Sequence, residues 1–96
     1  MEINVDGEGY LVDRSDWTPE VASEIARRDG YEISEEHWKF INAAREMYDE
    51  NAVVPPIRKF AKAMEVDAKY LYELFPKGPM KMICKVGGLP KPTGCV

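Results

Sequence analysis

The chain has 96 residues and a net charge of −4, with 45% hydrophobic and 31% charged residues. This length suits one domain with a small core, so we expect no buried cofactor. The acidic balance argues against nucleic acid as a partner, because non-specific binding depends on neutralising phosphates. No apolar run approaches the roughly 18 residues of a membrane helix, and the N-terminus lacks a signal-peptide pattern. We therefore expect no membrane insertion and a cytoplasmic location.

The N-terminal part of the chain predicts a hairpin and then a helix. Residues 1–13 alternate loosely around two glycines, which favours a short β-hairpin. Trp17 is expected in the core. Thr18 is a suitable N-cap and Pro19 a suitable first residue for a helix that ends at Gly30.

A second helix is predicted from the cap at Ser34 to about Glu50. One side of this helix carries Trp38, Ile41, Ala44, Arg45 and Tyr48. Pro55 and Pro56 predict a break before a third helix, and Asp67 is expected to cap a short fourth one.

The C-terminal part predicts one more short helix and then an arm. Residues 76–79 break the chain, and residues 80–86 can form one or two further turns. We expect a mainly α fold, a small orthogonal helical bundle over residues 1–87, followed by an extended mobile arm over residues 88–96. The residues expected to set the hinge and reach of this arm are Gly87, Gly88, Pro90, Pro92 and Gly94.

Both cysteines of the chain, Cys84 and Cys95, lie near its C-terminal end. In a reducing compartment such a pair is more often catalytic or redox-active than structural. The ten residues between them let Cys95 project outward or fold back onto Cys84. Spacing alone leaves open that Cys84 is only a packed side chain. Two cysteines and His37 are too few ligands for a metal site, so no metal is expected, and His37 is interpreted as structural or surface.

Basic residues gather toward the arm of this acidic chain. Together they could form a cationic surface that holds anionic sulfur species or docks an acidic partner. Solvated surface charge is the alternative for each one alone. The candidate contacts are Arg58, Lys77, Lys81, Lys85 and Lys91.

Residues 88–96 (GLPKPTGCV), with Cys84 upstream, resemble the C-terminal signature of the DsrC/TusE family, also described as the gamma subunit of dissimilatory sulfite reductase. The resemblance continues through residues 9–11, 36–38, 56–58 and 70–79. It implies a small helical fold with an N-terminal hairpin and a mobile arm. It also implies that Cys95 carries sulfur as a persulfide.

The second cysteine, Cys84, makes the chain resemble DsrC, in which sulfite-derived sulfur bridges the two cysteines as a trisulfide. The resemblance therefore implies a sulfurtransferase-like co-substrate of dissimilatory sulfur metabolism rather than a stand-alone enzyme. The implied partners are the alpha and beta subunits of dissimilatory sulfite reductase or another sulfurtransferase, and transiently a membrane-bound reductase complex. Members without this cysteine resemble TusE, a sulfur relay for tRNA 2-thiouridine synthesis, which is the alternative.

Two further classes remain open from the residues themselves. Consecutive short helices permit a helix-turn-helix DNA-binding regulator. The net charge and the lack of a helix rich in arginine and lysine argue against it. A thiol oxidoreductase acting without a partner would also use the two cysteines.

Overall fold

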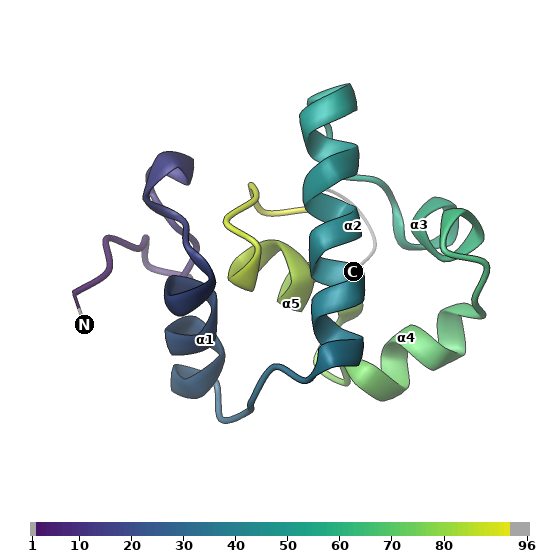
Figure 1. Cartoon of the computed structure of the whole chain (residues 1–96), viewed down its shortest axis with the longest axis horizontal. Helices are drawn as coiled ribbons and strands as arrows, with labels where there is room; N and C mark the ends of the chain where they lie inside the picture. The colour runs from purple at the N-terminus through teal and green to yellow at the C-terminus, as the bar shows by residue number, and fades with distance from the viewer. Residues whose placement is uncertain (1, 93–96) are drawn as a thin grey trace.

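Five α-helices and one short 3₁₀ turn form the regular structure of residues 2–92, the part of the chain described by the computed structural model (Figure 1). Within this part, none of the helices is both long enough and apolar enough to cross a membrane. The mainly helical prediction is confirmed. The elements are η1 (Arg14–Asp16), α1 (Pro19–Arg28), α2 (Glu35–Asn51), α3 (Ile57–Ala63), α4 (Ala68–Leu74) and α5 (Pro79–Val86).

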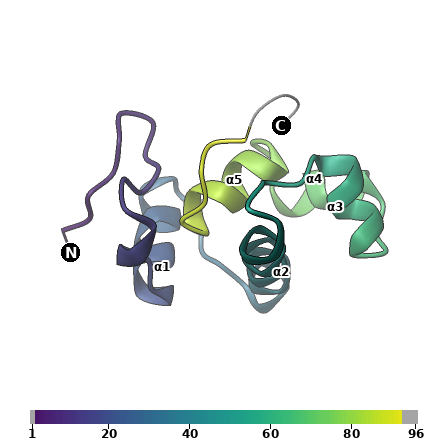
Figure 2. The ribbon, with the colours of Figure 1, turned by 90° about the horizontal axis from the view of Figure 1, so that it is seen from above.

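The last helix, α5, is the central element. It packs against α1, α2 and α4, while α3 packs on α4. Figures 1 and 2 show α1 on one side of α5 and the pair α3 and α4 on the other. Six of the eight residues of α5 are buried. A helix so apolar is stable in water only when its neighbours cover it on several sides.

The predicted helix starts agree with the structure. The side chain of Thr18 accepts the N–H of Val21 at the start of α1, and Ser34 accepts the N–H of His37 at the start of α2. These bonds satisfy backbone donors that have no partner within the helix. Asp67 stands at the N-cap of α4 as predicted, but its side chain makes no capping hydrogen bond.

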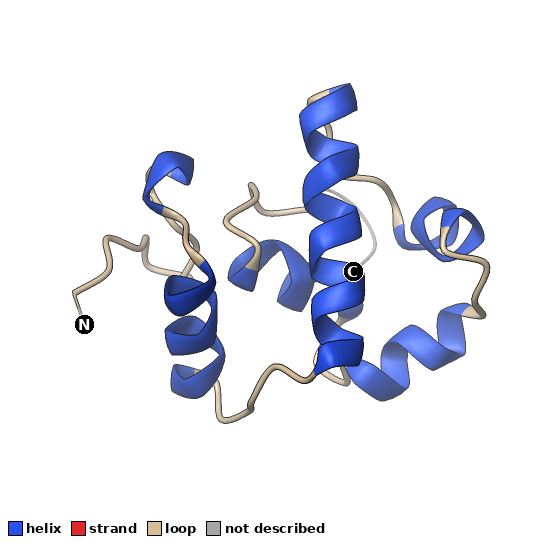
Figure 3. Ribbon diagram, in the orientation of Figure 1, coloured by secondary structure: helices blue, strands red, loops and turns tan. Residues whose placement is uncertain are grey.

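The structure does not support the predicted N-terminal β-hairpin. Residues 2–92 contain no strand (Figure 3), and only an isolated antiparallel bridge joins Val5 to Leu11. The physical reason is local competition for backbone donors. The carboxylate of Asp6 accepts the N–H groups of Glu8 and Tyr10 at 2.9 and 3.0 Å. These bonds close a turn, and within residues 2–92 the two arms beside it share only two backbone bonds, from the N–H of Asp6 to Tyr10 and from that of Val12 to Asn4.

Candidate functional site

Cys84 lies in α5 with its side chain fully buried in the core. It forms no disulfide with any residue of the described part of the chain. Burial raises its pKa from the ordinary 9.0 to about 12, because the thiolate would lose its hydration there. At neutral pH Cys84 is therefore a protonated thiol, which is not the nucleophilic form.

The N-terminal turn (residues 5–11) lies against α5 beside Cys84. Tyr10 is 4% exposed, and its hydroxyl donates to the carbonyl of Lys81 across 3.5 Å. The pKa of Tyr10 is raised to about 12, first by burial and next by the nearby Cys84. At Gly9, whose φ is +92°, a Cβ atom would lie 2.4 Å from Cε of Lys85. The backbone of the turn therefore rests on the side chain of Lys85 in α5.

Two side chains from other parts of the chain bind the end of α5. Nε1 of Trp17, just before α1, donates to the carbonyl of Val86 at 2.7 Å. Nη1 of Arg45, in α2, donates to the carbonyl of Gly87 at 2.5 Å. The guanidinium carbon of Arg45 lies 3.6 Å from the centroid of the Trp17 ring. We refer to Trp17 and Arg45, with the two carbonyls that they bind, as the arm anchor.

The residues that follow α5 begin on the helical body. Gly87 is the C-cap of α5, and Gly88 has a φ of +69°. The N–H of Leu89 donates to the carbonyl of Cys84 at 2.9 Å, and Leu89 is 1% exposed. Gly87 and Gly88 therefore lie in a packed helix end in this structure. Their role as a hinge, and the division of the chain after residue 87, remain predictions.

Beyond Leu89 the chain reaches the surface. Pro90 and Lys91 are exposed, and Pro92 is half-buried. Lys91 pairs with Glu8 of the N-terminal turn at 2.7 Å, with both side chains more than half exposed. Gly94 and Cys95 lie outside the described residues, so the roles predicted for them stay predictions.

The structure brings together three of the five predicted basic contacts. Lys77, Lys81 and Lys85 line a hollow of about 330 Å³ together with Asp29 and Met82. Lys85 is neutralised by Asp29 at 2.8 Å, and Lys77 donates to the backbone carbonyl of the same residue at 3.4 Å. The hollow therefore holds an excess of positive charge.

The other two predicted contacts lie elsewhere. Lys91 pairs with Glu8, as described above. Arg58 is exposed near the start of α3, a helix that packs on α4, and it does not line the hollow. The predicted basic surface is therefore divided among separate places in this structure.

His37 links two helices. Its Nδ1 accepts the backbone N–H of Ser34 at 3.0 Å, and its Nε2 lies 2.9 Å from the carbonyl of Leu74. These partners assign the proton of the neutral ring to Nε2, which then donates to Leu74. The interpretation of His37 as structural agrees with this geometry.

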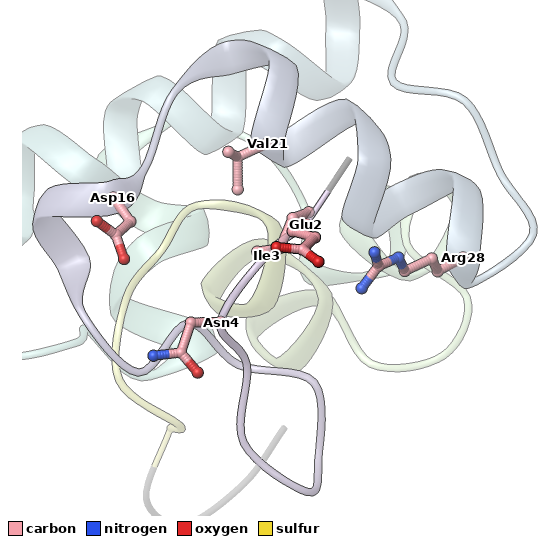
Figure 4. Close-up of a pocket in the computed structure, with 6 residues that line it drawn as sticks. All are labelled: Glu2, Ile3, Asn4, Asp16, Val21 and Arg28. Carbon is pink, nitrogen blue, oxygen red and sulfur yellow. The ribbon is translucent and has the colours of Figure 1, made fainter.

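A separate hollow of about 810 Å³ lies between the first residues of the chain and α1. Figure 4 shows Glu2 and Ile3 between Asp16 at one end of it and Arg28 at the other. None of the predicted site residues lines this hollow. It is therefore distinct from the surroundings of Cys84.

The family model described as "DsrC like protein" matches residues 1–96. The chain belongs to the DsrC-like family. The sulfurtransferase TusE of Salmonella paratyphi A is 43% identical to this DsrC-like chain, over 99% of the chain and 94% of the relative.

Two solved structures share the fold. The NMR structure of Allochromatium vinosum DsrC has a TM-score of 0.87 at 48% identity, covering 96% of this chain and 88% of that one. The crystal structure of the oxidized gamma-subunit of the dissimilatory sulfite reductase (DsrC) from Archaeoglobus fulgidus has a TM-score of 0.84 at 37% identity, covering 100% and 94%. The resemblance carried by residues 88–96 is therefore confirmed at the level of the family.

The arm anchor of this DsrC-like chain was not among the predicted site residues. Trp17 was expected to fill the core, and it packs partly buried against the core as well as binding Val86. The signal for Arg45 is present in the sequence, since it is a cation in the otherwise apolar stripe of the second helix. A buried or half-buried cation needs a partner, which here is a carbonyl beyond the end of α5.

Proposed function

We propose that this DsrC-like chain is a sulfur carrier in which Cys95 accepts and delivers sulfur and Cys84 acts as a second thiol. The observation that carries the proposal is the 48% identity to A. vinosum DsrC across 96% of a chain that contains both cysteines. The burial of Cys84 supports this division of roles. A thiol with a pKa near 12 is not the one that meets a sulfur donor first.

Loading of Cys95 requires no net oxidant when the donor is a persulfide. The thiolate of Cys95 attacks the outer sulfur of a persulfide on a partner cysteine. The S–S bond of the partner breaks, a new S–S bond forms on Cys95, and the partner cysteine leaves as a thiolate. Delivery to an acceptor thiol is the same exchange in reverse.

Cys84 adds a second reaction. Its thiolate attacks the inner sulfur of the Cys95 persulfide, so that a disulfide forms between Cys84 and Cys95 and hydrosulfide leaves. Two electrons and two protons from a dithiol reductant then restore both thiols. In the dissimilatory form of the proposal, sulfite-derived sulfur bridges the same two cysteines as a trisulfide. The sulfite reductase supplies two of the four electrons for this reduction and the two thiols supply the other two, while the sulfite oxygens leave as water.

The proposed partners are the alpha and beta subunits of a dissimilatory sulfite reductase, with a membrane-bound reductase complex as a transient partner. The A. fulgidus relative, named as the gamma-subunit of that reductase, supports this choice. The hollow lined by Lys77, Lys81 and Lys85 offers a place for an acidic partner surface.

A second candidate function is a relay that passes sulfur toward tRNA thiolation. It is supported by the 43% identity to the TusE sulfurtransferase of S. paratyphi A. The loading chemistry at Cys95 is shared by the two candidates. They differ in the proteins that bind the chain.

The proposal is tested by loading the purified chain with a low-molecular-weight persulfide and analysing its cysteine peptides by mass spectrometry. We expect the mass of one added sulfur atom on the peptide of Cys95. The Cys84→Ser variant should load to the same extent, and Cys95→Ser should not load.

Full loading of Cys95→Ser would overturn the proposal. Capture of partners from the native host by the intact chain separates the two candidates. Sulfite reductase subunits support the dissimilatory role, whereas tRNA-thiolating sulfurtransferases support the relay.

A further inference from the structure

The carbonyl groups at the end of α5 are bound by groups from distant parts of the chain. The last carbonyls of a helix have no partner within it. Here the N–H of Leu89 binds the carbonyl of Cys84, which with the positive φ of Gly88 is the bonding pattern of a Schellman cap. Trp17 binds the carbonyl of Val86, two residues further along the helix.

Arg45 completes this arrangement. It binds the carbonyl of Gly87 and stacks on the ring of Trp17. Burial lowers the pKa of Arg45, yet a guanidinium remains charged at physiological pH. A cation at the C-terminal end of a helix is favoured by the helix dipole, and a stacked cation gains further from the aromatic ring.

The arm anchor also fixes the position of Gly88. A Cβ atom at this residue would lie 2.8 Å from Cδ1 of Trp17, so the indole packs directly on the backbone. The residue that follows, Leu89, is buried at 1% exposure, and its N–H binds the carbonyl of Cys84, whose side chain is fully buried. Holding Leu89 in place therefore helps to keep the thiol of Cys84 inaccessible to reagents.

The length of the arm does not limit the meeting of the two cysteines. Cys95 lies six positions after Leu89 along the chain, and six residue steps span up to about 20–22 Å when extended. Access to the buried sulfur of Cys84 is the limiting factor. While the base of the arm is held, only the thiol of Cys95 can react. After the base of the arm is released, the thiols of both Cys95 and Cys84 can react.

We propose that Trp17 and Arg45 are positioning residues that hold the base of the arm and so keep the thiol of Cys84 buried. Release of the arm anchor exposes this thiol and allows it to react. This inference rests on the proposed function for its biological meaning. It would let one chain act either as a carrier through Cys95 alone or as a two-thiol carrier. The contacts of Val86, Gly87 and Gly88 with the helical body would determine which of these two modes operates.

The test measures alkylation of Cys84 by iodoacetamide under native conditions, in chains that carry Cys95→Ser so that only one thiol reacts. Trp17→Phe removes the indole donor but keeps a ring, and Arg45→Met removes the guanidinium but keeps the aliphatic stem. We expect each to raise the alkylation rate about tenfold or more, because each loses a hydrogen bond that holds the closed state. Gly88→Ala should do the same by displacing Trp17.

Two of the variants, Arg45→Met and Gly88→Ala, have a matched control. Lys39→Met removes another cation that lies over an aromatic ring, that of Phe40 at 5.6 Å. Gly7→Ala places a methyl group where no atom lies within 4 Å. Both should leave the alkylation rate of Cys84 unchanged. Equal rates in the anchor variants and their controls would overturn the inference.

A second measurement separates release of the anchor from general loss of stability. In the chain with an intact anchor, the alkylation rate at low urea should be nearly independent of urea, because local opening exposes little surface. A rate that follows global unfolding from the lowest urea concentration would overturn the inference, even if the variants fail to fold. No sulfur donor is used, so failure of Cys95 to load sulfur would leave this result unaffected.

Discussion

Cys84 and Tyr10 lie near each other between α5 and the N-terminal turn, and each has a pKa of about 12. Burial is the first cause for both, because their charged forms lose hydration in the fold. In the unfolded chain they release protons near their ordinary values of 9.0 and 10.0. Their contribution to stability is therefore fully present below pH 9 and is lost as the pH rises toward 12.

We predict that the free energy of unfolding falls between pH 9 and 12, by at most about 1.4 kcal/mol per pH unit for each group. Cys84→Ala should be less stable at pH 7, since it leaves a small cavity, but its stability should fall less steeply with rising pH. Urea unfolding at several pH values measures both effects. If the free energy of unfolding of Cys84→Ala fell with pH as steeply as that of the original chain, the prediction would be contradicted.

At the scale of elements, His37 does more than cap its own helix. It accepts from Ser34 at the start of α2 and donates to the carbonyl of Leu74 at the end of α4. Its ring also packs edge-on against Phe75, with centroids 5.0 Å apart. One side chain thus fixes the orientation of two helices that are joined through α3.

We predict that His37→Ala destabilises the chain by roughly 2–3 kcal/mol, since it loses a cap and a bond between helices. Ser34→Ala should cost about 1 kcal/mol because only the cap is lost. Asp67→Ala, at an N-cap without a side-chain bond, should change stability by less than about 0.5 kcal/mol. Thermal and urea unfolding of the three variants check the order. Equal losses for His37→Ala and Asp67→Ala would refute it.

Most helix boundaries could be predicted from the sequence because local residues determine them. Thr18 and Ser34 cap their own helices, and Pro55 with Pro56 separates α2 from α3. The N-terminal turn could not be predicted in this way. Alternation there is compatible with a strand, and the turn is instead closed by the carboxylate of Asp6, which accepts the N–H groups of Glu8 and Tyr10.

At the scale of the whole molecule, the candidate site combines what the sequence reveals with what only the fold can show. The tail sequence and its two cysteines identified the family. The burial of Cys84, and the meeting of Trp17 with Arg45 at the end of α5, depend on contacts between residues far apart in the chain. The basic surface was predicted as one group, and the fold separates Arg58 and Lys91 from the remaining lysines.

The gathering of lysines at one hollow can be tested by reversing their charge. The chain is acidic overall, yet the hollow beside α5 is lined by three lysines. We predict that Lys77→Glu combined with Lys81→Glu slows association with an acidic sulfurtransferase or reductase partner roughly tenfold at low salt, because local charge steers encounter. Stopped-flow measurement at two ionic strengths checks this.

The matched control for this test changes the same net charge at a different place. Lys59→Glu with Lys69→Glu replaces two exposed lysines that do not line the hollow. Its association should slow much less. Equal slowing by both pairs would show that net charge, rather than the hollow, governs the encounter.

The central position of α5 has a consequence for how the chain folds as it is made. The bond between Trp17 and Val86 joins residues 69 positions apart, and the bond between Arg45 and Gly87 spans 42. The helix that α1, α2 and α4 all contact is made after all three of them. These earlier helices therefore have no common core until α5 has emerged from the ribosome, and folding must wait for that helix.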